Sequence, residues 1–323
     1  MKTDYFFVLI FLLGAIFADG QSMQYNHPKK ASIQNSFLLL AFKMAGVKKD
    51  KKSVDGHNVM TREVPMKKLY RRHIVEKTIQ SKQAVYSIRS KKEGTGRTVL
   101  YLHGGAYTAD FLKQHWQFMS KLVRETACNV VAPDYPLAPQ HSWKDNIPFV
   151  LETYRNLLKE TPADSILFMG DSAGGGLIMA LALAARDADL PQPRHIVMLA
   201  PWLDLEMKNP EIDKLEKRDP MLNLPSVKRS ALLYATDSSN LREPYVSPMF
   251  GTLQSLAPMS LFVGGRDVLQ ADSNVFQQKC SRENVPLNYY FYPKMVHVWM
   301  LVPFLPESKF AFKQILAIIG HES

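Results

Sequence analysis

The chain has 323 residues, 46% of them hydrophobic and 11% aromatic, which is enough to bury one large core. Its formal net charge of +10 is uneven: residues 21–97 hold eighteen Lys or Arg against five Asp or Glu, and residues 98–323 hold twenty-one against twenty-three. Nothing in the chain resembles a nucleic-acid-binding module, so this basicity does not indicate that partner. Two cysteines, Cys128 and Cys280, support neither a disulfide framework nor a metal site, and buried free thiols are expected.

Two clusters carry much of the N-terminal basicity. They are residues 48–52 (Lys-Lys-Asp-Lys-Lys) and residues 67–72 (Lys-Lys-Leu-Tyr-Arg-Arg). A solvated surface is the ordinary interpretation of such clusters, and a weak contact between this basic N-terminal region and an anionic membrane surface is the alternative.

Residues 1–20 are predicted to be a secretory signal peptide. Lys2 precedes an uncharged apolar run over residues 5–18, and small residues follow at Ala18 and Gly20. The run is shorter than the roughly twenty residues that a membrane-spanning helix needs. We therefore expect a secreted or cell-envelope protein, with a cytoplasmic location as the alternative. Residues 21–323 contain no Pro-, Gly- or Ser-rich linker and no repeat, and are expected to form one domain.

Strands and helices are predicted to alternate along that domain. The predicted strands are short apolar or β-branched runs, at residues 73–79, 84–89, 98–102, 129–132, 166–169, 196–200, 260–263 and 288–292. The predicted helices cover residues 36–46, 112–126, 149–160 with a cap at Asp145-Asn146, 177–188, a segment starting near Ser226, and 309–319. Such alternation predicts a mainly parallel sheet with helices on both faces.

Two glycine-containing turns directly follow predicted buried strands. After residues 98–102 comes His103-Gly104-Gly105, where adjacent glycines let backbone N–H groups face open space, as an oxyanion hole requires. An ordinary tight turn is the alternative. After residues 166–169 comes Gly170-x-Ser172-x-Gly174, whose small residues suit the strained turn that presents a nucleophilic serine. A glycine-rich helix entry without chemistry is the alternative there.

Ser172, Asp267 and His297 follow three predicted strands in the chain order nucleophile, acid, histidine. A serine hydroxyl needs a base to take its proton, and the base needs an anion to fix its tautomer. The carboxyl ends of parallel strands share one edge of a sheet, so these side chains are expected to converge. The other histidines fit less well, because His115 lies inside a helical run and His195 precedes its strand.

These motifs together resemble the hormone-sensitive-lipase-like esterases of the α/β-hydrolase fold. The resemblance covers residues 98–323 and rests on five segments: His103-Gly-Gly-Ala-Tyr107, Asp134-Tyr-Pro-Leu-Ala-Pro139, Gly170-Asp-Ser-Ala-Gly-Gly175, Pro201-Trp-Leu-Asp204 and Arg266-Asp-Val-Leu269 followed by Asp272. It departs at Pro136 and Gln140, where the family often has Arg and Glu.

The resemblance implies roles for particular residues and a helical cap. Ser172 would be the nucleophile, Asp267 the acid and His297 the base. The oxyanion hole would use the N–H groups of Gly104, Gly105 and Ala173. The cap would come partly from about residues 21–60, and the weak pattern at about residues 206–248 predicts its second part.

The predicted function is hydrolysis of short- to medium-chain acyl esters through a covalent acyl-serine, with no metal or organic cofactor. Tyr107, Trp202 and Trp299 suggest an apolar substrate pocket, with plain core packing as the alternative. Because a triad does not encode its substrate, an acetyl-sugar deacetylase, an amidase or a true lipase is an alternative. A non-catalytic ligand-binding member of the fold is a more distant one.

Overall fold

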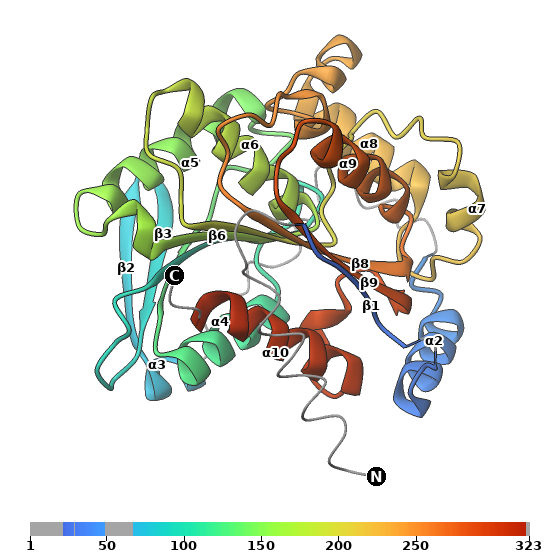
Figure 1. Ribbon diagram of the computed structural model, residues 1–323, viewed down its shortest axis with the longest axis horizontal. Coiled ribbons are helices and arrows are strands. Elements are labelled where there is room, and N and C mark those ends of the chain that lie inside the picture. Colours follow the sequence, from blue (N-terminus) through green and yellow to red (C-terminus); the bar gives the residue numbers. More distant parts are fainter. Residues whose placement is uncertain (1–21, 29, 49–66, 321–323) are drawn as a thin grey trace.

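The computed structural model describes residues 22–28, 30–48 and 67–320. The nine strands of this part form one sheet in the order β1-β9-β8-β7-β6-β4-β5-β3-β2 (Figure 1). From β1 to β5 along this order all neighbours are parallel, and β3 and β2 add an antiparallel edge. The strands are β1 (Gln24–Asn26), β2 (Ile74–Gln80), β3 (Gln83–Arg89), β4 (Thr98–Leu102), β5 (Asn129–Pro133), β6 (Ile166–Asp171), β7 (His195–Leu199), β8 (Met259–Arg266) and β9 (Leu287–Val296).

Helices cover both faces of this sheet. Figure 1 shows α5, α6, α8 and α9 on one face and α3, α4 and α10 on the other. Every residue of β4 and β6 is buried in consequence, which is why both read as continuous apolar runs. The helices are α2 (Ile33–Ala45), α3 (Lys67–Arg72), α4 (Lys113–Thr126), α5 (Trp143–Leu158), α6 (Ala173–Asp187), α7 (Ile212–Glu216), α8 (Leu224–Ala235), α9 (Gln270–Arg282) and α10 (Pro306–Gly320).

The predicted strands and their mainly parallel arrangement are confirmed, and two details differ. β1 was not predicted, although it pairs in parallel with β9. Helix α5 begins earlier than expected, because Ser142 is its N-cap and Asp145 is the third helical residue of the same capping box, so the predicted cap at Asp145-Asn146 is wrong.

Helix α2 extends the predicted helix 36–46 by a turn at its start. The Ser32 hydroxyl caps it by accepting from the Asn35 N–H at 3.1 Å, and Gly46 ends it in the left-handed conformation at φ 60°. Asn35 Nδ2 donates to the carbonyl of Lys294 at 3.2 Å, which ties the helix to the end of β9.

One face of α2 leaves a stripe of large apolar side chains in solvent. Its members are spaced one or two helical turns apart and are between 53% and 80% exposed: Ile33, Phe37, Leu40 and Met44. No helix in the described residues is both long and apolar enough to cross a bilayer.

The structure describes parts of the two segments that were expected to form the cap. In the segment expected over residues 21–60, β1 belongs to the main sheet and α2 lies beside it, while residues 49–60 fall outside the described part of the chain. The predicted signal peptide, residues 1–20, also lies outside it. In the segment 206–248, α8 buries Val227, Ala231 and Tyr234 in the same core as α6, so this segment is packed into the body of the domain.

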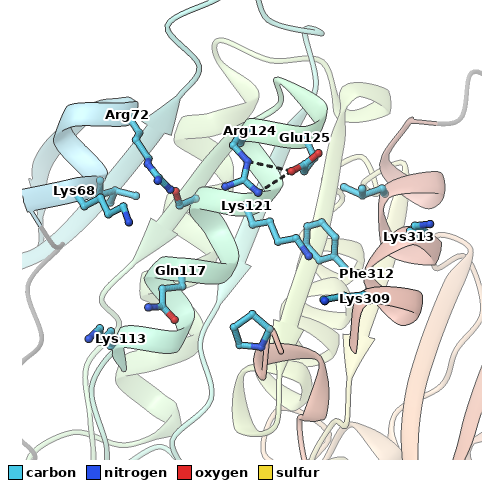
Figure 2. Close-up of a pocket in the computed structure, with 14 residues that line it drawn as sticks. Lys68, Arg72, Lys113, Gln117, Lys121, Arg124, Glu125, Lys309, Phe312 and Lys313 are labelled. Atoms are coloured by element: carbon cyan, nitrogen blue, oxygen red, sulfur yellow. Dashed lines mark hydrogen bonds and ion pairs between the residues drawn. The ribbon is translucent and has the colours of Figure 1, made fainter. Parts of the chain in front are cut away.

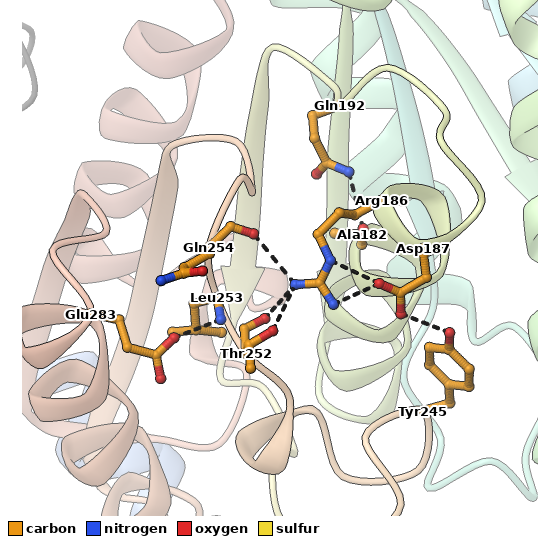
Figure 3. A network of polar contacts seen from close by, with 9 residues as sticks. All are labelled: Ala182, Arg186, Asp187, Gln192, Tyr245, Thr252, Leu253, Gln254 and Glu283. Atoms are coloured by element: carbon orange, nitrogen blue, oxygen red, sulfur yellow. Dashed lines mark hydrogen bonds and ion pairs between the residues drawn. The ribbon is translucent and has the colours of Figure 1, made fainter.

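A polar network fixes the far end of α6 (Figure 3). The Arg186 guanidinium donates to the carbonyl of Thr252 at 2.6 Å and pairs with the neighbouring Asp187 at 2.7 Å. Asp187 in turn accepts from the Tyr245 hydroxyl at 2.8 Å, and the Leu253 N–H donates at 2.6 Å to Glu283, which directly follows α9. The network therefore joins α6, the 245–254 segment and the end of α9.

Cys128 and Cys280 are buried and unpaired, as expected. Burial raises the pKa of the Cys128 thiol to about 11 and that of Cys280 to about 12. Both thiols therefore stay protonated at neutral pH and behave as small apolar side chains.

Candidate active site

Ser172 occupies the turn between β6 and α6, as the motif predicts. Its backbone has φ 53° and ψ −121°, a conformation that non-glycine residues adopt only when the surrounding structure enforces it. The Ser172 N–H donates to the carbonyl of Leu199 at 2.9 Å, and its own carbonyl accepts from the Trp202 N–H at 2.9 Å. A Cβ at Gly174 would overlap the carbonyl oxygen of Leu102, so a larger residue would push α6 away from the sheet.

The three residues predicted to converge do so at the carboxyl edge of the sheet. His297, which follows β9, places Nε2 2.9 Å from the Ser172 Oγ. Its Nδ1–H donates to the Asp267 Oδ2 at 2.8 Å, and Asp267 follows β8. The Asp267 side chain is fully buried, and its other oxygen accepts from the Leu269 N–H at 2.9 Å. Ser172 stays partly exposed, so the hydroxyl is the accessible end of this hydrogen-bonded chain.

The surroundings of His297 raise its pKa above 6.5. Burial alone would lower the pKa, but the carboxylates of Asp267, Asp219 and Asp171 together outweigh burial. The imidazole is thereby made a better proton acceptor for the Ser172 hydroxyl, while Asp267 fixes the tautomer that leaves Nε2 free to accept.

Asp219 is a part of the site that sequence reasoning missed. It lies in the 206–248 segment, and its carboxylate accepts from the N–H groups of Met221 at 2.7 Å, Leu222 at 3.0 Å and Val268 at 2.9 Å. Burial first, and then the nearby Asp267, raises the pKa of Asp219 to about 6. Asp219 therefore anchors the residue that follows Asp267. No local pattern around Arg218-Asp219-Pro220 signals this role.

The glycine loop after β4 differs from expectation in one respect. The Gly104 N–H donates to the Asp171 Oδ1 at 3.0 Å, so it is already engaged. The N–H groups of Gly105 and Ala173 donate to no acceptor within the described residues. Gly105 has φ 129°, where a side chain is strained, and a Cβ there would press on the backbone of Ala109.

Asp171 holds this loop through a buried network. Its Oδ1 accepts from the Tyr101 hydroxyl at 2.6 Å as well as from Gly104, and its Oδ2 lies 3.4 Å from the His115 Nε2. Burial would raise the pKa of Asp171, but His115, Tyr101 and His103 outweigh it and the pKa is lowered. The carboxylate is therefore charged. His115, which is no candidate base, serves this network from within α4.

His103 shapes the other side of the loop. Its ring stacks on Tyr135 with 4.4 Å between ring centroids, and its Nδ1–H donates to the Gly104 carbonyl at 2.7 Å. The Tyr135 hydroxyl donates to the His103 carbonyl at 2.6 Å. Burial lowers the pKa of His103 to about 3, so the ring is neutral and serves to orient the loop.

The three aromatic residues proposed for a substrate pocket are packed in the core. Tyr107 stacks on Tyr234 with 3.7 Å between centroids and lies 5.9 Å from Trp202, and all three side chains are buried. Trp299 is buried on the opposite face of the sheet. Tyr107, Tyr234 and Trp202 therefore form an aromatic wall beside the nucleophile turn.

Comparison with known proteins identifies the family. The profile of the α/β-hydrolase fold matches residues 99–301, so the chain belongs to that family. An esterase of the bacterial hormone-sensitive lipase family shares this structure with a TM-score of 0.78 at 26% identity, covering 90% of this chain and 99% of that one. The chain is accordingly a hormone-sensitive-lipase-like member of the fold.

Relatives of similar length agree with this placement. The chain is 30% identical over 220 residues to an esterase of Acinetobacter venetianus, covering 67% of this chain and 72% of the relative. It is 32% identical over 220 residues to an acetyl-hydrolase of Streptomyces hygroscopicus, covering 68% and 73%. The protein is a carboxylic-ester hydrolase of the serine type.

Proposed function

We propose that Ser172, His297 and Asp267 hydrolyse short- to medium-chain carboxylic esters in two acyl-transfer steps. The observation that carries this proposal is the unbroken hydrogen-bonded chain from the Ser172 Oγ through His297 to Asp267, with distances of 2.9 and 2.8 Å. Such a chain supplies a nucleophile, a base and a fixed tautomer.

In the first step the Ser172 Oγ bonds to the ester carbonyl carbon while its proton passes to the His297 Nε2. The tetrahedral intermediate collapses, and His297 gives the proton to the departing alkoxide, which leaves as the alcohol. Water then attacks the acyl-serine with the same base, and the acid departs with Ser172 restored. The N–H groups of Gly105 and Ala173 are the proposed oxyanion donors, each worth about 3 kcal/mol to the transition state. We assign Gly104 to holding the loop through Asp171.

The aromatic wall supports a preference for short acyl groups. Tyr107, Trp202 and Tyr234 are buried against one another beside Ser172, and we expect this packed wall to limit the acyl chain on that side. The name of the Streptomyces relative, an acetyl-hydrolase, points the same way. A series of p-nitrophenyl esters from acetate to palmitate tests this, and kcat/KM is expected to fall beyond medium chains. Highest kcat/KM with palmitate would contradict it.

Replacing the nucleophile tests the mechanism. Ser172→Ala is expected to lower kcat for p-nitrophenyl butyrate by at least about 10³-fold, because Ser172 is the one hydroxyl among the described residues that lies against His297 Nε2. The matched control is Ser165→Ala, which should retain wild-type turnover. Ser165 directly precedes β6, at the end of the strand that lies away from Ser172. Equal rates in the two variants would overturn the assignment.

Export and membrane contact are proposed on separate grounds. Cleavage of the predicted signal peptide after residues 18–20 would leave every described strand intact, since β1 begins at Gln24. N-terminal sequencing of the native protein tests this, and a start at Met1 would contradict it.

We further assign the apolar stripe of α2 and the basic N-terminal region to contact with an anionic membrane surface. Support comes from exposed Phe37 and Leu40 beside the cation Lys43 in the last turn. Vesicle flotation should decrease in F37S/L40S. Equal flotation of this variant and the wild type would contradict the contact.

A further inference from the structure

A basic groove lies between α3, α4 and α10, on the solvent side of the helices that cover one face of the sheet (Figure 2). Its volume is about 840 Å³, and no residue of the ester-hydrolysing site lines it. Seven cationic side chains surround it: Lys68, Arg72, Lys113, Lys121, Arg124, Lys309 and Lys313.

The charge of the groove is almost uncompensated. Glu125 is the one carboxylate that lines it among the described residues, and Arg124 already pairs with it at 2.7 Å. Lys121 holds its Nζ 3.6 Å from the centre of the Phe312 ring. The other five cations form no ion pair or side-chain hydrogen bond with any described residue. Like charges facing one another across a shared space destabilise a protein, and an anion that binds between them relieves this cost.

Two neutral polar residues in the lining, Gln117 and Ser120, suit a phosphate-bearing ligand, and the other uncharged lining residues are apolar. The Gln117 amide can donate hydrogen bonds, and the Ser120 hydroxyl is fixed by the His73 Nε2 at 2.8 Å. Burial lowers the pKa of His73, and Arg72 and Arg124 lower it further, so this edge of the groove lies in a positive potential. A cavity that offers many donors and few acceptors selects an anion with several acceptor oxygens.

We propose that the basic groove binds a ligand that carries two or more phosphate groups. A single phosphate dianion would leave most of the other five cations without an anion, and the volume exceeds what one phosphate fills. Lysines from three helices act as point charges for separate phosphates, and the planar guanidinium of Arg72 can bind one phosphate through two parallel hydrogen bonds. A nucleic-acid ligand is less suited, because Phe312 is the one aromatic ring that the described residues contribute to the lining, and Lys121 covers its face.

Two sources share this chemistry, a free oligophosphate and the headgroup of a phosphorylated lipid. Calorimetric titration with tripolyphosphate at about 0.15 M ionic strength tests the first. Flotation with vesicles containing phosphatidylinositol bisphosphate, against vesicles of phosphatidylcholine alone, tests the second. Saturable binding in either arm supports the groove and assigns its source.

The decisive variant is K309E/K313E, which reverses two exposed charges on α10. The control is K159E/K228E, which makes the same change in net charge at exposed positions on the opposite face of the sheet. We expect the first variant to weaken binding by roughly tenfold or more and the control to bind like the wild type. Both variants should hydrolyse p-nitrophenyl butyrate normally, so the outcome is independent of the catalytic proposal. Absence of binding in both arms, or equal weakening by the two variants, would overturn the groove as a site.

Discussion

The Asp171 side chain connects the turn that carries Ser172 to the glycine loop after β4. It precedes Ser172 directly in the chain, and it accepts hydrogen bonds from the Gly104 N–H and the Tyr101 hydroxyl. The position of the proposed oxyanion donors therefore depends on a charge that never touches the substrate. Because the carboxylate is buried, each donor it loses leaves an unsatisfied polar group.

Asp171→Asn is expected to lower kcat about tenfold or more with little change in KM, since the amide accepts fewer hydrogen bonds and the loop carrying Gly105 loosens. Tyr101→Phe removes one donor and leaves the charge, so a smaller loss is expected. Steady-state kinetics on p-nitrophenyl butyrate measures both. A larger loss in Tyr101→Phe would show that the carboxylate does not position the loop.

Asp219 contributes, after Asp267, to the raised pKa of His297. The imidazole must be neutral to accept a proton, so kcat/KM should fall as pH decreases through its pKa, which lies above 6.5. Removing the Asp219 charge withdraws part of this effect, so Asp219→Asn is expected to move the acid limb of the profile to lower pH. Asp213→Asn, at an exposed position of α7, is the control. A shift to higher pH would refute the electrostatic role.

At the scale of elements, Arg186 connects parts of the chain that the sheet itself does not hold. Its guanidinium reaches the Thr252 and Gln254 carbonyls from the last turn of α6 (Figure 3). That turn lies a whole helix length from Ser172, which occupies the other end of α6. A substitution at the Arg186 end of α6 can therefore change the stability of the protein without changing the catalytic residue at the other end.

Arg186→Ala should lower the free energy of unfolding by about 1–3 kcal/mol, because several charge-assisted hydrogen bonds are lost at a partly buried site. Activity at 25 °C should be unchanged. Urea unfolding measures the first, and Arg155→Ala, an exposed arginine of α5, is the control. An unchanged unfolding midpoint in Arg186→Ala would mean that the network adds nothing.

At the scale of the whole molecule, buried titratable groups act on stability in opposite directions. Burial lowers the pKa of His103 to about 3 and that of His195 to about 4. Their contribution to the free energy of unfolding is therefore complete above pH 6.5 and is lost as the pH falls. Burial raises the pKa of Asp219 to about 6 and that of Asp272 to about 7, so their contribution is lost as pH rises from 3.8. The two sets oppose each other in mildly acidic solution.

Asp272→Asn should isolate the second set. Asn209 donates to one Asp272 oxygen at 3.0 Å, and the other oxygen is buried without a partner and is also repelled by Asp204. The amide cannot ionise. The free energy of unfolding of the variant, relative to that of the wild type, should therefore increase on the order of a few kcal/mol from pH 5 to pH 8. Urea unfolding at both pH values tests this. An equal difference at the two pH values would contradict it.

The sequence is most informative where function depends on local pattern. Ser172 and Gly104 each follow a continuous apolar strand, so their location at one edge follows from the parallel topology. β1 has three residues and no periodicity, and it becomes a strand only through β9, far away in the chain. Asp219 lies in a weakly patterned segment and acts through tertiary contacts alone.

The distribution of charge along the sequence does not predict the basic groove, for a related reason. The count assigns the basicity to residues 21–97, yet five of the seven cations in the basic groove come from α4 and α10. Residues 98–323 are nearly balanced in charge as a whole, but α4 and α10 each hold more basic than acidic residues, and packing brings these basic side chains together. A linear sequence records composition, whereas potential depends on where side chains meet in space.

The pairing of β1 with β9 has a consequence for synthesis on the ribosome. β1 can pair only after β9, the last described strand, has been synthesised. His297 follows β9, so the base is among the last residues to emerge. A nascent chain carries Ser172 long before it carries a group able to activate it. We therefore expect the growing polypeptide to lack esterase activity until β9 and His297 have emerged and joined the sheet.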